Sequence, residues 1–593
     1  MLAMTRAGKG QTVIEATIDM WSRERKKNNM VINDPKGELL VKNYVRLAVR
    51  GFHIVQFNLI NAMKTDIYNP LGMAADSARE GDFTKSATYV QNIGSVFFPV
   101  EGSDDPVWPN AARNAFMRAA YGLMDFYLES EEEMMLRADK IGQDKKTLER
   151  NIDRMWGKMT LYNCYQMFVN LTAKKKKNPW LKFVKLRDEA SKIIQEVTAY
   201  NQSRKPDEPE MKAASPNPEI QYLFTLSDEE YKNYEAKMER LGAIWNDEPE
   251  ADLLTLYFGA TALLPRNQMR VLVNNAHNAL AAMGGADKMM ASVYGIAITA
   301  MSFFVDPTIA TLTSGTPSQN VDLAGLSFPR RLGVRFHNDY LKKHHLITQQ
   351  VRWSAYRDPN FTDCLGEKFE HVDSINREGW ARYYFEGIFP NEKTYLKMEI
   401  RNPMTEQLTG EMFFMFEKTY QTSFDAKFFV KDPVLQERIV KNGILTELKA
   451  KIDEVTGEVT YVSGKTKFKR TKINFNSDNL APVTADSNAI IRFMTRYSEK
   501  PKAVFLVTPP HLMDYAKLLL ILLKQLVDLN FDQSYMTKSN QKPLCKTRFM
   551  LEELGNLQSD GHGISGFQTM LSIGLGQEQQ FSATSCVVKS YAA

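Results

Sequence analysis

The first forty residues constrain this chain more than any other stretch. Residues 5–12 read T-R-A-G-K-G-Q-T, a lysine between two glycines at the start of a helical pattern. Glycine lets backbone N–H groups close around phosphate oxygens, and the lysine reaches the outer phosphates of a nucleoside triphosphate. The stretch therefore predicts a nucleotide site. Its candidate binding residues are Thr5, Arg6, Ala7, Gly8, Lys9, Gly10, Gln11 and Thr12.

The loop departs from the usual phosphate-binding pattern in three ways. Ala3 stands where the first glycine belongs, and Gly10 stands where a hydroxyl should follow the lysine. Thr12 is then the candidate Mg²⁺-side hydroxyl, two residues later. No hydrophobic strand precedes the loop, although such loops normally lie between a strand and a helix. We expect that strand to be missing or truncated. The alternative is a glycine-containing helix start that binds no nucleotide.

Composition narrows the class of protein. A chain of 593 residues with 44% hydrophobic content holds several domains. A net charge of +5 permits local basic faces without proving a nucleic-acid partner. The four cysteines are widely spaced, which favours a reducing cytoplasm over disulfides or a metal site. We find no signal peptide, and the longest apolar stretch, near Leu518–Leu523, is too short to span a bilayer.

Residues 1–101 predict the first half of a nucleotide-binding domain. Helices are expected at 13–25 and 39–48, and buried strands at 29–33 and 52–57. Alternating helices and strands imply a parallel sheet, whose ligands lie at the carboxyl ends of the strands. Asp34 and Lys36 follow the first strand, so we expect them beside the nucleotide. Asn58 and Asn61 follow the second strand.

Residues 102–325 predict an all-α domain. Apolar residues recur at helical spacing from Phe116 to Tyr127 and from Ile152 to Tyr162, and we interpret both stripes as core. Residues 201–218 are proline-rich and polar, which predicts a loop. Four consecutive lysines suggest either DNA phosphate contacts or a solvated helix end. They are Lys174, Lys175, Lys176 and Lys177.

Residues 326–481 predict a β-rich domain. Apolar and charged residues alternate over 396–401, a turn is expected at Thr409 and Gly410, and residues 455–459 suggest a hairpin. A basic run surrounds Phe468 and fits either a nucleic-acid surface or a charged edge that blocks strand pairing. Its lysines are Lys465, Lys467, Lys469 and Lys472.

Residues 482–593 predict the second half of the nucleotide-binding domain. A buried strand is expected at 503–507, an apolar helix at 515–529 and a second strand ending in Glu552 and Glu553. Such an acidic pair suits ATP hydrolysis: Glu552 would orient the water shell of the metal, and Glu553 would act as the general base. The alternative is the acidic N-terminus of a helix.

These motifs together resemble the type IV coupling proteins of bacterial conjugation, the TraG/TraD-like group. The most specific part is D-P-K-G-E at residues 34–38, close behind G-K-G at residues 8–10. N-P-L at 69–71, Asp104 with Trp108 and Ala111, A-V-F-L-V at 503–507 and E-E-L-G-N at 552–556 also fit, with Glu552 in place of aspartate. The resemblance implies a membrane-anchored hexameric ATPase that uses ATP and Mg²⁺ to deliver relaxase-bound DNA into a secretion channel. It also implies a RecA-like core interrupted by an all-α domain.

The chain also departs from that family. Transmembrane helices are absent, the β segment is large, and the glutamine motif has no secure counterpart, although Gln577, Gln579 and Gln580 lie nearby. We therefore expect a soluble fragment of a protein that works at the cytoplasmic face of the bacterial membrane. Two other functions stay open: a non-motor scaffold that binds nucleotide and recruits substrates, and a cytoplasmic DNA-remodelling helicase.

Overall fold

The computed structural model describes most of the chain and divides it into two compact units. Unit 1 comprises residues 1–97, 126–162 and 303–593, and unit 2 comprises 98–125 and 163–302. The described residues are 2–3, 10–60, 64–100, 105–245, 248–282, 287–406, 408–418, 429–430, 449–452, 459–463, 466–469, 490–507, 515–532, 535, 542–552, 579–583 and 585–586.

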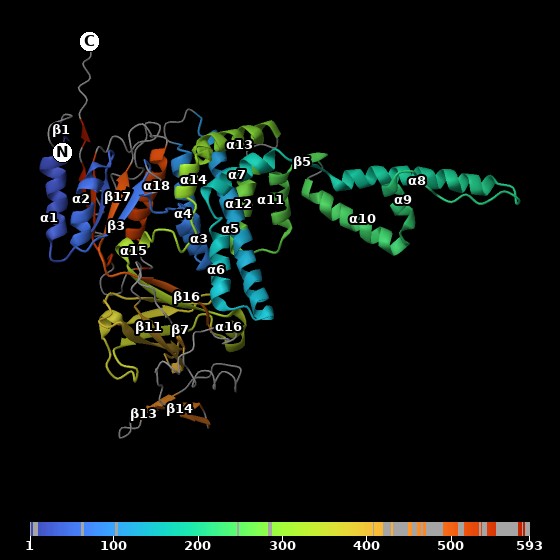
Figure 1. The fold of residues 1–593 in the computed structure, drawn as a ribbon. Coiled ribbons are helices and arrows are strands. Elements are labelled where there is room, and N and C mark those ends of the chain that lie inside the picture. Colours follow the sequence, from blue (N-terminus) through green and yellow to red (C-terminus); the bar gives the residue numbers. More distant parts are fainter. Residues whose placement is uncertain are drawn as a thin grey trace, which may run out of the picture. The chain divides into compact units, whose positions relative to one another are not determined.

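Unit 1 contains a parallel sheet, part of which (β3 and β17) lies beside α2 (Figure 1). Its strands run in the order β19-β18-β2-β17-β3, and every neighbouring pair is parallel. Both ends of the chain contribute strands, as expected for a domain whose two halves lie at the two ends of the sequence. The strands are β2 (Asn29–Asn33), β3 (His53–Asn58), β17 (Lys502–Val507), β18 (Thr547–Leu551) and β19 (Gln579–Ala583). The predicted α/β class with a parallel sheet is confirmed.

Helices cover both faces of this sheet because successive side chains of each strand point to opposite sides. On one face, Met30 and Phe505 pack against the buried residues Ile14, Ile18 and Leu47. These come from the π-helix η1 (Gly10–Glu15), α1 (Ala16–Arg23) and α2 (Glu38–Val49). The apolar helix α18 (Ala516–Asn530) lies on the other side (Figure 1). All four helices and strands predicted between residues 13 and 58 are present.

A strand of two residues precedes residues 5–12, which agrees with the expectation that this strand is missing or truncated. β1 (Leu2–Ala3) pairs in parallel with β20 (Ser585–Cys586), which follows β19 after one residue. Two residues are too few to show a hydrophobic run in the sequence. A strand thus precedes the predicted loop and a helix follows it, which is the order in which phosphate-binding loops occur.

Unit 1 also contains helices from the middle of the chain. The long helix α5 (Val107–Ile141) contributes its second half. The remaining helices of this unit are α3 (Gly72–Arg79), α4 (Phe83–Phe97), α6 (Lys145–Trp156), η4 (Ser302–Val305), α14 (Pro307–Leu312), α15 (Ala324–Ser327), α16 (Asn338–His344) and η5 (Glu367–Phe369).

Unit 2 is helical apart from one short strand pair. Its elements are α7 (Leu161–Thr172), β4 (Lys175–Lys177), α8 (Pro179–Ser203), α9 (Pro218–Thr225), α10 (Asp228–Gly242), η3 (Ala243–Trp245), β5 (Glu250–Asp252), α11 (Leu253–Leu263), α12 (Gln268–Ala282) and α13 (Asp287–Met301). Helices α8, α9 and α10 share a small core around Phe183 and Leu223. The predicted loop is shorter than expected and spans residues 204–217.

The predicted helical stripes are largely core. Phe116, Ala120 and Tyr127 are buried on α5, and Ile152 and Met159 are buried in the second stripe. That second stripe is not one helix, because α6 ends at Trp156 and α7 begins at Leu161.

The β-rich part of unit 1 forms separate antiparallel sheets. The described strands are ordered β12-β11-β10-β7-β8, β16-β6-β9 and β13-β14-β15. Their bounds are β6 (Arg330–Phe336), β7 (Gln350–Tyr356), β8 (His371–Ser374), β9 (Trp380–Tyr384), β10 (Lys393–Arg401), β11 (Leu408–Glu417), β12 (Phe429–Val430), β13 (Lys449–Ile452), β14 (Val459–Ser463), β15 (Thr466–Lys469) and β16 (Ile490–Tyr497).

Two details of this region differ from the sequence prediction or extend it. Thr409 and Gly410 lie inside β11 and not in a turn, since residues 403–405 form the turn after β10. β13 and β14 pair antiparallel around the predicted hairpin, whose turn, residues 453–458, lies outside the described residues.

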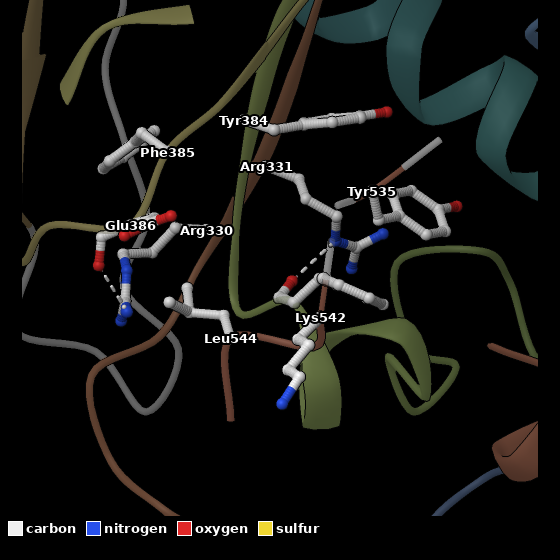
Figure 2. A pocket seen from close by; sticks show the side chains of 9 residues that line it. Arg330, Arg331, Tyr384, Phe385, Glu386, Tyr535, Lys542 and Leu544 are labelled. Atoms are coloured by element: carbon white, nitrogen blue, oxygen red, sulfur yellow. Dashed lines mark hydrogen bonds between the residues drawn. The ribbon is translucent and has the colours of Figure 1, made fainter. Parts of the chain in front are cut away.

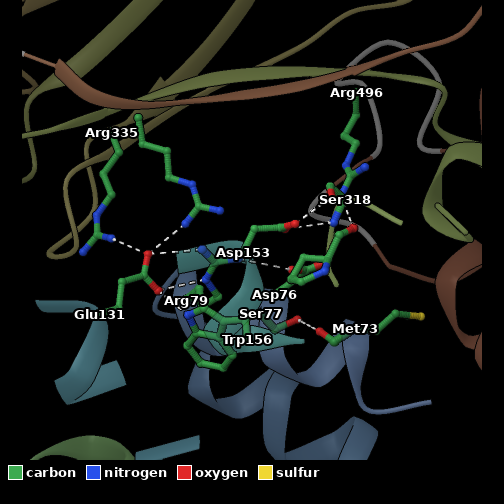
Figure 3. Close-up of polar contacts among 12 residues, drawn as sticks. Met73, Asp76, Ser77, Arg79, Glu131, Asp153, Trp156, Ser318, Arg335 and Arg496 are labelled. Atoms are coloured by element: carbon green, nitrogen blue, oxygen red, sulfur yellow. Dashed lines mark hydrogen bonds and ion pairs between the residues drawn. The ribbon is translucent and has the colours of Figure 1, made fainter. Parts of the chain in front are cut away.

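A buried carboxylate joins the β-rich part to the helices of unit 1. Glu131 on α5 is 3% exposed, and its two oxygens accept hydrogen bonds from Arg79 at 3.0 and 3.1 Å (Figure 3). Arg492 on β16 donates at 2.8 Å, and Arg335 on β6 lies 3.6 Å away. The indole of Trp156 donates to the same carboxylate at 2.6 Å. One acid thus links three helices and two strands.

The neighbouring arginines determine the protonation state of Glu131. Burial alone would raise the pKa of Glu131, but Arg79, Arg492 and Arg335 outweigh burial and hold it well below its usual range. Burial and the nearby Arg79 lower the pKa of Arg492 to about 10. Glu131 is therefore ionised at neutral pH, and its loss would leave three arginines without their shared counter-ion.

Glu131→Gln should destabilise the protein strongly. Removing one partner of a buried ion pair typically costs about 3–5 kcal/mol, because the remaining charges stay buried without compensation. We expect a clear fall in the urea concentration at the unfolding midpoint at pH 7. Glu133→Gln, on the exposed side of the same helix, is the control and should leave the midpoint unchanged.

The same variant gives a pH test with a defined sign. A carboxylate whose pKa is depressed by folding stabilises the protein above its unfolded pKa, and this contribution is lost as pH falls. The stability gap between the native protein and Glu131→Gln should stay constant from pH 6 to 8 and shrink below about pH 4.5, the ordinary glutamate value. A constant gap down to pH 3 would contradict the ion-pair interpretation.

Candidate nucleotide-binding site

The predicted acidic residues meet at the carboxyl edge of the parallel sheet. Asn33, the last residue of β2, lies in register with Leu551 of β18 and Leu506 of β17. Asp34 and Glu552 follow directly, one after each strand. The Asn33 amide donates to the backbone oxygen of Glu552 at 2.6 Å. This bond ties the two strand ends together, so both acids lie at the same edge.

Asparagine 33 is a site residue that the sequence interpretation missed. It is fully buried at the end of an otherwise apolar strand. A polar residue just before D-P-K-G-E was the available signal, because a buried amide needs hydrogen-bond partners.

The carboxylate of Asp34 is buried and turned toward α2. It is 1% exposed, and one oxygen accepts a hydrogen bond from the backbone N–H of Leu40 at 2.8 Å. Burial raises the pKa of Asp34, and the backbone amides of Leu40, Leu39, Gly37 and Lys36 oppose that rise. The Asp34 amide donates to Leu506 at 2.8 Å. Asp34 thus fixes the start of α2 against β17.

Gly37 and Lys36 complete this turn. Gly37 has φ +74°, a left-handed conformation that glycine adopts without strain. Gly37 is the residue before α2, and its N–H donates to the Asp34 carbonyl at 3.2 Å. Lys36 is exposed at the same turn. The D-P-K-G-E motif therefore holds a lysine outward at the sheet edge while its aspartate is buried.

The loop itself lies largely outside the described residues. This applies to Thr5, Arg6, Ala7, Gly8 and Lys9. Gly10, Gln11 and Thr12 form the first part of η1, and Thr12 is exposed. Ile14 and Ile18 then anchor the helix in the core of the sheet. The loop therefore enters a helix that is fixed against β2 and β17.

Ion pairs fasten this helix to its neighbours. Arg50, just after α2, donates to Asp19 of α1 at 2.9 Å, and Lys42 of α2 lies 2.7 Å from Glu15. Arg548 of β18 bonds Glu24 at 2.6 Å and stacks over Trp21 at 5.2 Å. These contacts tie β18, which Glu552 follows, to the C-terminal end of α1.

Of the other predicted catalytic and polar residues, some are described by the structure and others are not. Glu552 is partly exposed in the turn after β18, whereas Glu553 lies outside the described residues. Asn58 ends β3, and its N–H donates to the hydroxyl of Thr65 at 3.0 Å. Asn61 and Asp104 also lie outside the described residues.

The structure describes the first predicted basic stretch fully and the second only in part. Residues 174–177 are exposed, and the last three form β4, which pairs antiparallel with the acidic strand β5 (Glu250–Asp252). Lys467 and Lys469 lie in β15, whereas Lys465 and Lys472 fall outside the described residues. Contact of either stretch with DNA stays a prediction.

Among the residues that the structure describes, no group of three or more histidine, cysteine or acidic side chains has the arrangement of a metal site. Within the same residues, no helix combines the length and apolar character needed to cross a bilayer.

Comparison with known proteins supports the resemblance drawn from the motifs. The family described as type IV secretory system conjugative DNA transfer matches residues 1–202. The match includes the loop, β2, the D-P-K-G-E turn and β3. No curated protein matches the chain. Residues 1–202 are therefore similar to the type IV secretion family of conjugative DNA transfer and match a coupling protein of the TraG/TraD type.

Proposed function

We propose that this chain is a P-loop ATPase that drives DNA into a type IV secretion channel during conjugation. The family implies a part in conjugative DNA transfer. One structural observation supports the motor role most strongly. The parallel sheet joins residues 29–58 to residues 502–583, so Glu552 reaches the edge where the loop helix and the D-P-K-G-E turn also lie. A RecA-like core is part of this proposal.

In the proposed site, the loop holds the triphosphate. Lys9 contacts the β- and γ-phosphates, and Gly8 and Gly10 allow the backbone N–H groups to approach them. Helix η1 begins at the loop, so its free N–H groups and the positive end of its dipole favour the same anion. Lys36 is exposed at the same sheet edge and adds a positive charge there.

The residues at this edge fit a magnesium ion that accompanies the nucleotide. Thr12 is exposed in the first turn after the loop, and Glu552 is partly exposed at the strand end. Oxygen donors of this kind are what Mg²⁺ prefers, often through bound water. When bound, the ion neutralises charge between the outer phosphates. Asp34 is not part of this set, since its carboxylate is occupied by the N-terminus of α2.

Glu553 is the proposed general base. The sequence places it directly after Glu552. In this role Glu553 would accept a proton from the attacking water, and Glu552 would orient the water shell of the metal. Hydrolysis would then drive movement of relaxase-bound DNA, with secretion-channel proteins as partners. Assembly as a homo-hexamer at the cytoplasmic face of the membrane completes the proposal.

The experiment that tests this function is steady-state ATP hydrolysis with and without single- and double-stranded DNA. A motor should hydrolyse ATP faster when DNA is present. A scaffold that binds nucleotide only for assembly should show no DNA-stimulated turnover. A DNA-remodelling helicase should separate strands without any membrane partner.

Lys9→Ala should weaken ATP binding at least tenfold without unfolding the chain. Charge-assisted contacts to phosphate are each worth about 1.5–3 kcal/mol, and the lysine makes them only when nucleotide is present. Calorimetric titration with ATP measures the change. Lys27→Ala, at an exposed position beyond α1, is the control. Native-like affinity in Lys9→Ala would refute the assignment of the loop.

Glu553→Gln should bind ATP normally and turn it over about 10²–10⁴-fold more slowly, because glutamine keeps the shape but cannot accept the proton. Glu552→Gln should instead weaken Mg²⁺-dependent binding. Single-turnover hydrolysis and binding with and without Mg²⁺ separate the two. If each variant shows the phenotype expected of the other, the assignment of the acidic pair is wrong by one residue. If turnover is unchanged in both variants, the acids belong to a helix terminus and not to a hydrolytic site.

Replacing Lys174, Lys175, Lys176 and Lys177 with glutamine tests their contact with DNA. Each phosphate contact releases counter-ions, so the logarithm of affinity falls with the logarithm of salt by about 0.7–0.9 per contact. The variant should flatten that slope by up to about three units, measured by fluorescence anisotropy. Lys232→Gln with Lys237→Gln on α10 is the control pair. An unchanged slope would make the run a solvated surface.

A further inference from the structure

Strand β2 carries an asparagine at each end, and both are buried. Asn29 is 4% exposed and Asn33 is fully buried, while the three residues between them are apolar. A buried amide is stable where its polar atoms find hydrogen-bond partners. The partners of these two side chains therefore show what holds each end of the strand.

The amino end of β2 is held by contacts within the packed fold. The Asn29 amide donates to the backbone oxygen of Leu326, and its side-chain oxygen accepts from the backbone N–H of Lys502 at 2.7 Å. Two residues beyond Leu326, the ring of Phe328 packs 5.2 Å from that of Tyr535 in the wall of a small hollow (Figure 2). Asn29 thus joins β2 to β17 and to α15.

The carboxyl end of β2 is held through the acidic end of β18. The Asn33 amide donates to the backbone oxygen of Glu552 at 2.6 Å. The register between β2 and β18 ends with the pair Asn33 and Leu551, so Glu552 is the first residue beyond it. This side-chain bond therefore extends the attachment of β18 to β2 by one residue, past the point where the paired strands end.

The same bond restricts the backbone of Glu552. This residue lies in the turn after β18, and its side chain is partly exposed. The carbonyl that Asn33 holds belongs to a planar peptide group, which includes the Cα of Glu552. The side chain leaves from that Cα, so anchoring the carbonyl limits the directions that the Glu552 carboxylate can take.

The backbone that carries Asn33 is itself rigid. The N–H of the next residue, Asp34, donates to the backbone oxygen of Leu506 at 2.8 Å. The Asp34 carboxylate accepts a hydrogen bond from the N–H of Leu40 at 2.8 Å. Asn33 therefore acts from a support that β17 and α2 both hold, and a functional group needs such a support to be placed precisely.

We propose that Asn33 is a positioning residue for Glu552, which keeps the Glu552 carboxylate where it can orient the water shell of Mg²⁺. This inference rests on the proposed ATPase function and adds to it a residue that acts on metal binding without touching the metal or the nucleotide. Loss of the Asn33 amide should therefore reproduce the effect of Glu552→Gln in a weaker form. ATP binding without Mg²⁺ should not change, because the phosphates are held by the loop.

The test measures ATP affinity of the full chain by calorimetry, with Mg²⁺ and with EDTA, and turnover at saturating ATP. Asn33→Ala should reduce the gain in affinity that Mg²⁺ produces at least threefold and leave affinity in EDTA unchanged. Turnover should fall about tenfold, since a misplacement of about 1 Å can cost about 10²-fold in rate. Asn29→Ala, at the other end of the same strand, is the matched control. It should lower the melting temperature and leave both quantities native.

A second variant, Asn33→Thr, guards against misfolding of Asn33→Ala. Threonine suits a strand, and its hydroxyl lies one bond closer to the backbone than the asparagine amide. Thermal melts establish which variants are folded, and either folded variant decides the question. In the Glu552→Gln background, Asn33→Ala should cause no further loss of Mg²⁺-dependent binding, because the residue acts through Glu552.

The outcomes separate this proposal from the ATPase function. A native response to Mg²⁺ in a folded Asn33 variant, with a clear loss in Glu552→Gln, would overturn the role of Asn33 alone. An equal loss in Asn29→Ala, or a full further loss in the Glu552→Gln background, would also overturn it, since Asn33 would then only support the sheet. A native response in Glu552→Gln itself would refute the metal-side role of that acid and this proposal with it.

Discussion

The pairing of β2 between β17 and β18 is the constraint on which unit 1 depends. More than 400 residues separate β2 from these strands, so closing that loop carries a large entropic cost that later contacts must offset. Burial on both faces supplies the compensation. Each strand is an apolar run, and helices from both ends of the chain cover it. The candidate nucleotide site exists only once these strands are in register.

A second, polar layer holds the rest of unit 1 together. Helices α3, α5 and α6 meet β6 and β16 through the carboxylate of Glu131 and the arginines around it. A buried charge cluster of this kind adds less stability than an apolar core of the same volume. It does restrict how these helices and strands can pack, because a displacement of any of them leaves an arginine without its carboxylate partner. Strand β6 also carries Arg330 and Arg331, so arginines recur along this sheet.

The carboxyl edge of the sheet gathers the polar residues of the candidate site. Asp34 and Glu552 follow β2 and β18 there, and the Asn33 amide ties the two strand ends together. Because these strands come from opposite ends of the chain, the two acids come to one edge only through the tertiary fold.

Local sequence patterns determined the secondary structure around the site. Apolar runs identified β2, β17 and β18, and helical spacing identified α2, α5 and α18, because burial on one face or on two leaves a periodic trace in the chain. The D-P-K-G-E turn and the strand before Glu552 were found in the same way. Tertiary structure alone decided the rest. Asp34 turned out to be buried, with its carboxylate bound by the backbone N–H of Leu40 in α2, since nothing local distinguishes such an acid from one that faces a ligand. Asn33 and Glu131 gained their roles from partners far away in sequence, and the charge balance of a buried side chain depends on which partners folding brings within hydrogen-bond distance.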